Sequence, residues 1–278
     1  MASEPISLRT SQLSIDDGVA RFCHQRPTAR NALSAELHAD YAEMLDRVQA
    51  DRNVRALVIT GSGGSFCAGG DLKAALARQQ DTDPEANLAD DMRTRIRNYH
   101  GWIERLHSLE MPVIAAVDGP AVGAGFSIAL AADFILASSR AVFCMSFAKV
   151  GLVPDLGAFY FLPRAVGMPK AKELALTARR ISAAEGQQLG FVHSVHAPEA
   201  LDVEALSFAH RFTAGSREAM GLTKKLFNRS FETPYATLAE LEGQAQGIAV
   251  TTRYHATAVA GFVNGTPAAY DWDRPNTR

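Results

Sequence analysis

The sequence predicts an α/β fold with largely parallel strand pairing, followed by a C-terminal segment made only of helices. The apolar runs ALVIT (56–60) and PVIAAV (112–117) are typical of strands buried on both faces. Segments with helical spacing of apolar residues alternate with such runs, which indicates strand–helix–strand units. Strand-like runs stop after residue 197. We therefore predict a core over residues 1–197 and, over 198–278, a helical segment that must pack on another surface.

The first part of the chain predicts strands, then one helix. Strands are expected over ISL, LSI and VARFC within residues 6–23, with a turn at Asp17-Gly18. Ser34 is a plausible N-cap for a helix whose apolar residues up to Val48 share one face. After strand 56–60 we expect a Gly-rich loop and then a polar flap or surface insertion at 78–91. Helical periodicity resumes at Met92.

The remaining elements follow the same alternation. AGFSIALAA after strand 112–117 is expected to be a helix, FILAS and VFCMS are expected to be strands, and GAFYFLPRAVG is expected to be a second helix. The C-terminal helices are predicted within three segments, which are 202–215, 217–230 and 234–263.

Composition excludes several classes of function. The net charge of −2 over 278 residues gives no basic field for nucleic acid or an anionic membrane. The longest apolar stretch is too short to span a bilayer, and the first ten residues lack the pattern of a signal peptide. The cysteines Cys23, Cys67 and Cys144 have no CxxC spacing and no paired histidines, which argues against zinc or disulfides. We expect a soluble cytoplasmic protein without a metal.

Two Gly-rich loops follow the buried strands, GSGGSFCAGGDL (61–72) and DGPAVGAGFS (118–127). Neither contains the lysine motif of a phosphate loop, and Ile128 stands where a dinucleotide-binding loop needs its third glycine. Residues 125–129 approach the GxSxG motif of serine hydrolases, but Ser127 is expected inside a helix rather than at its start. What such loops can offer is backbone N–H groups. Two of them facing one cavity would form an oxyanion hole for a thioester enolate.

Four stretches together resemble the crotonase (enoyl-CoA hydratase/isomerase) superfamily. They are RPTARNALSAEL (26–37), VITGSGGSFCAGGDL (58–72), MPVIAAVDGPAVGAGFSIALAADFILAS (111–138) and FAKVGLVPDLGAFYFLPRAVG (147–167). The resemblance implies a spiral of ββα turns and a helical trimerisation segment, in a homotrimer or a dimer of trimers. It also implies an acyl-CoA thioester substrate, with coenzyme A entering only as part of that substrate and no other cofactor.

The resemblance also implies roles for individual residues. The oxyanion-hole positions fall on the backbone N–H groups of Ala68 and Ala124. The small residues beside them would let the thioester approach closely, and they are Gly69, Gly70, Gly123 and Gly125. Asp71 and Leu72 belong to the same motif, and capping a helix is the favoured role of Asp71. Arg26, Arg30 and Lys73 are candidates to hold the phosphates of coenzyme A.

The resemblance further points to the reaction. The two glutamates with which hydratases of this superfamily activate water fall on Ser127 and Phe147, which we expect to line the substrate site instead. Asp155, in GLVPDLG, falls where dienoyl-CoA isomerases and the isomerases of ring-opened phenylacetyl-CoA carry a catalytic carboxylate. We therefore predict an enoyl-CoA isomerase with Asp155 as the proton-shuttling base. An enoyl-CoA hydratase and a non-catalytic acyl-CoA binder remain alternatives, and Asp155 could also serve as a helix N-cap.

Overall fold

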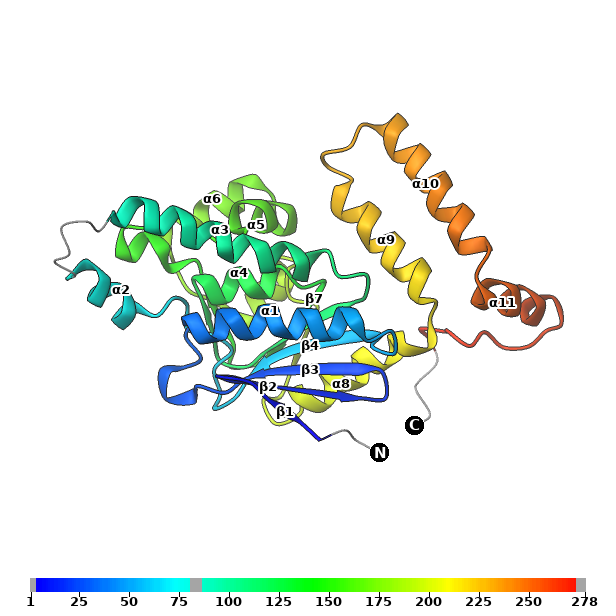
Figure 1. The fold of residues 1–278 in the computed structure, drawn as a ribbon, viewed down its shortest axis with the longest axis horizontal. Coiled ribbons are helices and arrows are strands. Elements are labelled where there is room, and N and C mark those ends of the chain that lie inside the picture. Colours follow the sequence, from blue (N-terminus) through cyan, green and yellow to red (C-terminus); the bar gives the residue numbers. More distant parts are fainter. Residues whose placement is uncertain (1–3, 81–86, 274–278) are drawn as a thin grey trace.

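The computed structural model describes residues 4–80 and 87–273, and a seven-stranded sheet of order β1-β2-β3-β4-β5-β7-β10 forms its centre (Figure 1). The strands are β1 (Ile6–Ser7), β2 (Ser11–Asp16), β3 (Val19–His24), β4 (Ala56–Gly61), β5 (Val113–Val117), β7 (Phe134–Ser138) and β10 (Ser194–His196). β1, β2 and β3 pair antiparallel, and the pairs from β3 to β10 are parallel. A smaller sheet joins β6 (Pro120–Val122), β8 (Val142–Cys144) and β9 (Ile181–Ser182). The predicted parallel α/β core is thus confirmed.

Helices cover both faces of the large sheet, which is why its central strands are continuous apolar runs. Leu57 and Ile59 of β4 pack into the cluster that holds α1 (Ala35–Ala50) and α3 (Leu88–His107). Ala56 and Val58 face the opposite way, onto α8 (Leu201–Arg211). The remaining helices of the core are α2 (Leu72–Gln79), α4 (Ala124–Leu130), α5 (Ala158–Val166), α6 (Met168–Thr177) and α7 (Ala183–Gln188). Short 3-10 helices span Pro27–Ala29, Ser146–Val150 and Phe212–Ala214.

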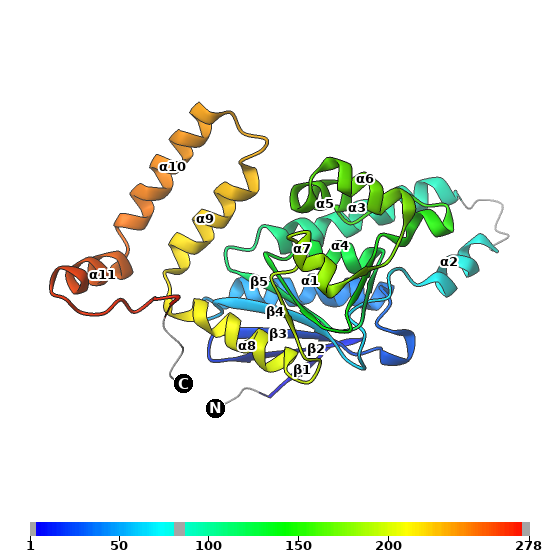
Figure 2. The ribbon, with the colours of Figure 1, turned by 180° about the vertical axis from the view of Figure 1, so that it is seen from behind.

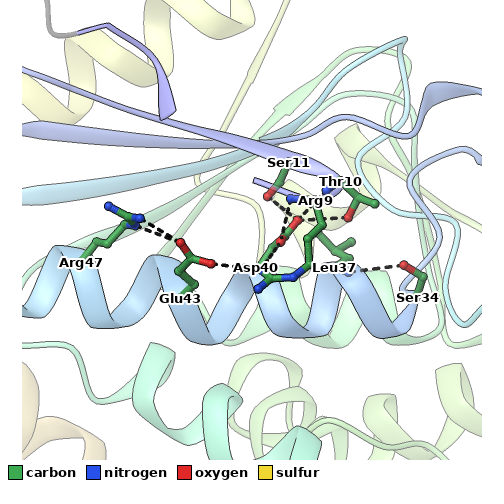
Figure 3. Close-up of polar contacts among 8 residues, drawn as sticks. All are labelled: Arg9, Thr10, Ser11, Ser34, Leu37, Asp40, Glu43 and Arg47. Carbon is green, nitrogen blue, oxygen red and sulfur yellow. Dashed lines mark hydrogen bonds and ion pairs between the residues drawn. The ribbon is translucent and has the colours of Figure 1, made fainter. Parts of the chain in front are cut away.

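Helix α1 is anchored to the start of the sheet by one buried carboxylate (Figure 3). Asp40 accepts hydrogen bonds from the backbone N–H groups of Arg9 (3.1 Å) and Thr10 (2.7 Å) and from the hydroxyl of Ser11 (2.9 Å). Burial alone would raise the pKa of Asp40, but these hydrogen bonds outweigh it and hold the pKa below its ordinary value. Ser34 caps the helix as predicted, accepting from the Leu37 N–H at 3.3 Å.

The last three helices extend away from the core (Figures 1 and 2). They are α9 (Arg217–Arg229), α10 (Tyr235–Val250) and α11 (Arg253–Val263). The predicted helical C-terminus is confirmed, with one break, where the Thr252 side chain accepts from the His255 N–H and starts α11. Lys224 ties α9 to the core through Asp133 (2.7 Å) and the carbonyl oxygen of Met111 (3.1 Å). No helix in the described part of the chain has the length and apolarity needed to cross a membrane.

The predicted polar insertion at 78–91 is only partly an insertion. Its first residues complete α2, and helix α3 begins at Leu88 rather than at Met92. The Asn87 side chain caps α3 by accepting from the Asp90 N–H at 3.1 Å, which lets the helix start among polar residues. Residues 81–86 of the predicted insertion lie outside the described part of the chain.

Candidate active site

The two Gly-rich loops are bound to each other along their backbones. Cys67 of the first loop donates its N–H to the Pro120 carbonyl oxygen and accepts from the Val122 N–H, both at 3.0 Å. Gly125 allows α4 to pack on this contact, because a Cβ there would lie 2.2 Å from the Cys67 carbonyl oxygen. The start of α4 is therefore fixed beside the end of the first loop.

Beside these loops, two backbone N–H groups have no acceptor among the described residues, and only one of the two belongs to a residue predicted as an oxyanion donor. The Ala68 N–H donates to the Arg30 carbonyl oxygen at 3.0 Å, so the prediction of Ala68 as an oxyanion donor is wrong. The Leu33 N–H donates to the Gly69 carbonyl oxygen, and the Leu33 carbonyl oxygen accepts from the Asp71 N–H. These two hydrogen bonds lie on either side of Gly70 and do not use its N–H. Among residues 4–80 and 87–273, no acceptor pairs with the N–H groups of Gly70 and Ala124. Gly70 thus replaces Ala68 as the candidate donor opposite Ala124.

Both N–H groups belong to residues that line a cavity of about 140 Å³. Of the predicted site residues, the cavity wall contains Ala68, Gly69, Gly70, Asp71, Leu72, Gly123, Ala124, Phe147 and Asp155. Leu33, Ala75, Met92, Ile96, Val150 and Leu152 make most of the remaining wall apolar. Arg78, Arg95, Tyr99 and Ser146 complete it. A cavity of this kind, apolar with a few polar groups, is typical of a small-molecule site.

Asp155 is the carboxylate of this cavity that has no structural partner. Its Oδ1 atom is buried and has no hydrogen-bond donor among the described residues. The alternative that Asp155 caps α5 is wrong, because Gly157 holds the N-cap position without any side-chain cap. Leu156 and Gly157 adopt left-handed φ angles of 53° and 80°, and this turn separates Asp155 from the helix. Burial raises the pKa of Asp155 to about 6, against a lowering by the nearby charge of Arg95.

Asp71, by contrast, has a structural role as the N-cap of α2. Its side chain caps α2 by accepting from the Ala74 N–H at 3.2 Å, and Arg26 approaches the other oxygen at 3.4 Å. The hydrogen bond from Ala74 is the main cause that holds the pKa of Asp71 below its ordinary value. The favoured capping role of Asp71 is therefore confirmed, although the residue also contributes to the cavity wall.

Four predicted binding residues lie outside the cavity wall, and one of them, Arg26, pairs with Asp71 as described above. Ser127 is fully buried inside α4, where its hydroxyl points to the Gly123 carbonyl oxygen at 3.4 Å. This corrects its prediction as a substrate-binding residue and also excludes the exposed elbow of a serine hydrolase. Arg30 and Lys73 are exposed, so their predicted contact with phosphates remains a prediction. In the described part of the chain, no group of three or more His, Cys, Asp or Glu side chains could hold a metal ion.

Residues 14–271 match the model of the family described as enoyl-CoA hydratase/isomerase. The chain belongs to this family. It is 33% identical over 249 residues to 1,2-epoxyphenylacetyl-CoA isomerase of Escherichia coli, covering 90% of this chain and 93% of that protein. It is also 33% identical to a probable enoyl-CoA hydratase of Rhodobacter capsulatus, with coverage of 87% and 90%. A solved enoyl-CoA hydratase/isomerase from Cupriavidus metallidurans superposes with a TM-score of 0.88 at 38% identity, covering 95% of this chain and 97% of that one. The crotonase fold expected from the sequence is thus established.

Within this enoyl-CoA hydratase/isomerase, sequence reasoning missed the wall formed by α2 and α3. Arg78 comes from α2, and Arg95 and Tyr99 come from α3, where the Arg95 Nε donates to the Tyr99 hydroxyl at 2.8 Å. Met92, Ile96 and Tyr99 recur at helical spacing, which marks one face of α3. Extending that face to Arg95 would have suggested a cation beside the apolar residues. Arg78 carried no comparable signal, because it lies at the start of the polar stretch.

Proposed function

We propose that this family member is an enoyl-CoA isomerase that moves a carbon–carbon double bond within an acyl-CoA thioester. The observation that carries the proposal is the presence, in one cavity wall, of two backbone N–H groups and one carboxylate oxygen that have no hydrogen-bond partner among the described residues. Gly70 and Ala124 supply the N–H groups, and Asp155 supplies the carboxylate. This combination suits a reaction that forms an enolate and moves one proton.

The reaction can be written with these groups alone. The thioester carbonyl oxygen accepts hydrogen bonds from the Gly70 and Ala124 N–H groups, which makes the adjacent Cα–H more acidic. The Asp155 carboxylate removes a Cα proton from a β,γ-unsaturated thioester, and the electron pair spreads over the dienolate. The same carboxyl group, after its proton has exchanged with solvent, then delivers a proton to Cγ, so that the double bond forms between Cα and Cβ. No atoms are gained or lost, and the donors hold the negative charge where it develops.

The setting of Asp155 supports its role as both base and acid. A general base works best when its pKa lies near the working pH, and burial moves the pKa of Asp155 to about 6. The unpaired Oδ1 leaves one oxygen available to take the proton. Hydration by two carboxylates is harder to write, because the family's glutamate positions hold the buried Ser127 and the aromatic Phe147.

The C-terminal arm supports the proposal that the protein forms a trimer or a dimer of trimers. Helices α9 to α11 and the link before α10 expose large apolar side chains, namely Phe227, Phe231, Tyr235 and Phe262. Exposed apolar patches of this kind commonly mark contacts between subunits. The three cysteines are free, which suits the reducing cytoplasm, where we propose that the protein acts. The mass of the protein in solution tests the assembly.

A product assay tests the isomerase proposal. Wild type should convert β,γ-enoyl-CoA into the conjugated α,β-enoyl-CoA, and Asp155→Asn should lose this activity by at least about 100-fold. Asp202→Asn removes a carboxylate that pairs with Arg21 outside the cavity and should keep full activity. Formation of 3-hydroxyacyl-CoA from α,β-enoyl-CoA at a higher rate would instead assign a hydratase. Thioester binding without either product would assign a non-catalytic binder.

A further inference from the structure

Two arginines stand in the wall of the active-site cavity and form no ion pair within the described part of the chain. Arg78 of α2 and Arg95 of α3 line this cavity together, and the same pair lines two hollows that adjoin it. Asp91 borders those two hollows, yet among residues 4–80 and 87–273 no carboxylate forms an ion pair with either arginine. Asp71 acts on Arg78, and Asp155 on Arg95, only through their charges, without an ion pair. Both arginines thus stand beside a largely apolar surface.

Both arginines are half-buried, so an anion that binds between them would meet two partly desolvated charges. Burial, together with the charge of Arg95, lowers the pKa of Arg78. Two like charges that share one apolar wall are stabilised when an anion binds between them, because each guanidinium can donate charge-assisted hydrogen bonds to it. The Tyr99 hydroxyl, which accepts from the Arg95 Nε, helps to fix the direction of that side chain.

The position of Asp155 indicates which end of the substrate reaches these arginines. In the proposed reaction Asp155 acts on acyl carbons beyond the thioester carbonyl, whereas the sulfur and the nucleotide lead away on the other side of that carbonyl. Arg95 is close enough to Asp155 for its charge to act on that carboxyl group. Met92, Ile96 and Leu152 of the same wall suit the methylene groups of an acyl chain. The arginines therefore lie on the acyl side.

We propose that Arg78 and Arg95 bind a carboxylate at the far end of the acyl group, so that this protein takes monothioesters of dicarboxylic acids. This inference deepens the proposed function, because it rests on the same cavity as the site for the acyl group. It assigns to the two arginines the choice of substrate and leaves the proton transfer to Asp155.

Binding of saturated thioesters tests the inference separately from catalysis. Isothermal titration calorimetry would compare matched pairs that differ only in a terminal methyl or carboxylate: butanoyl- and succinyl-CoA, hexanoyl- and adipoyl-CoA, octanoyl- and suberoyl-CoA. Wild type should bind at least one carboxylated member more tightly than its partner. Arg78→Gln and Arg95→Gln should each reduce this preference by about 10- to 100-fold, and Arg95→Lys should retain part of it. Arg97→Gln removes an exposed charge from the same helix, outside the cavity wall, and should change nothing.

Three outcomes separate the alternatives. The inference is overturned if wild type shows no preference for the carboxylated thioester over its methyl-terminated partner. It is also overturned if Arg78→Gln and Arg95→Gln show the same preference as wild type. If the arginines instead hold a phosphate of coenzyme A, both variants lose the difference in affinity between coenzyme A and its 3′-dephospho form, which also overturns it. Asp155→Asn should lose isomerase activity but keep the carboxylate preference. The isomerase proposal and the carboxylate-binding proposal can therefore be refuted separately.

Discussion

Replacing Asp155 with asparagine is expected to stabilise the folded protein at neutral pH while removing the proposed base. Burial raises the pKa of Asp155 from 3.8 to about 6. A carboxyl group whose pKa is higher in the folded than in the unfolded chain opposes folding above the folded pKa, because ionisation is less favourable in the cavity than in water. Asparagine has nearly the same size and does not ionise, so the variant escapes this effect.

The size of the gain follows from the pKa change. A tenfold change in the ionisation constant is worth about 1.4 kcal/mol, so the ionised Asp155 reduces the free energy of unfolding by about 3 kcal/mol near neutral pH. Solvent at the mouth of the cavity lowers the expected gain to about 2–3 kcal/mol. The gain should shrink as the pH falls through 6 and vanish below 3.8, where the carboxyl group is protonated in both states.

Thermal unfolding followed by circular dichroism checks this prediction. At one fixed protein concentration, the unfolding temperature of Asp155→Asn should exceed that of wild type by roughly 4–10 °C near neutral pH. Asp118→Asn is the matched control with the opposite sign, because the hydrogen bond from Arg140 holds the pKa of Asp118 below its ordinary value. An Asp155→Asn variant that is no more stable than wild type at neutral pH would refute the reasoning.

Three further predictions follow from the geometry. The kcat/KM of the double-bond shift should fall about tenfold per pH unit below about pH 6, since protonated Asp155 cannot accept a proton, and a flat profile there would exclude it as the base. Gly70→Pro removes one oxyanion donor and should lower kcat by roughly 100- to 1,000-fold. Gly70→Ala keeps the N–H, and no protein atom lies within 4 Å of the added Cβ, so it should lose less activity than Gly70→Pro; equal losses would contradict the assignment. Asp40→Asn should lower the free energy of unfolding by about 3 kcal/mol in urea titrations. This decrease in the free energy of unfolding should have its full size above pH 3.8 and become smaller as the pH falls, because the pKa of Asp40 is lower in the folded than in the unfolded chain. An unchanged urea midpoint at neutral pH would contradict the prediction.

Local features of the fold could be predicted from the sequence because neighbouring residues determine them. Ser34 caps α1 three residues before the N–H that it accepts from, and the run at 56–60 is buried on both faces as its composition indicates. The resemblance of GLVPDLG to the corresponding stretch of the superfamily's isomerases predicts that Asp155 belongs to the site, and Asp155 lies in the cavity wall.

The identity of the oxyanion donors could not be predicted in the same way. Whether Ala68 or Gly70 presents a free N–H depends on the Arg30 carbonyl oxygen and on Leu33, which come from an earlier part of the chain. The arginine wall was missed for a related reason. Helices α2 and α3 bring Arg78 and Arg95 to one cavity by tertiary packing, which the periodicity of either helix alone does not reveal.

Deuterium exchange between heavy water and the acyl group tests most directly the claim that Asp155 moves a proton on a bound enolate. Wild type incubated with a β,γ-enoyl-CoA should place deuterium at Cα and Cγ, as read by mass spectrometry. Asp155→Asn should exchange at least about 100-fold more slowly while still binding the thioester. Exchange at the wild-type rate in Asp155→Asn would place the base elsewhere and contradict the account.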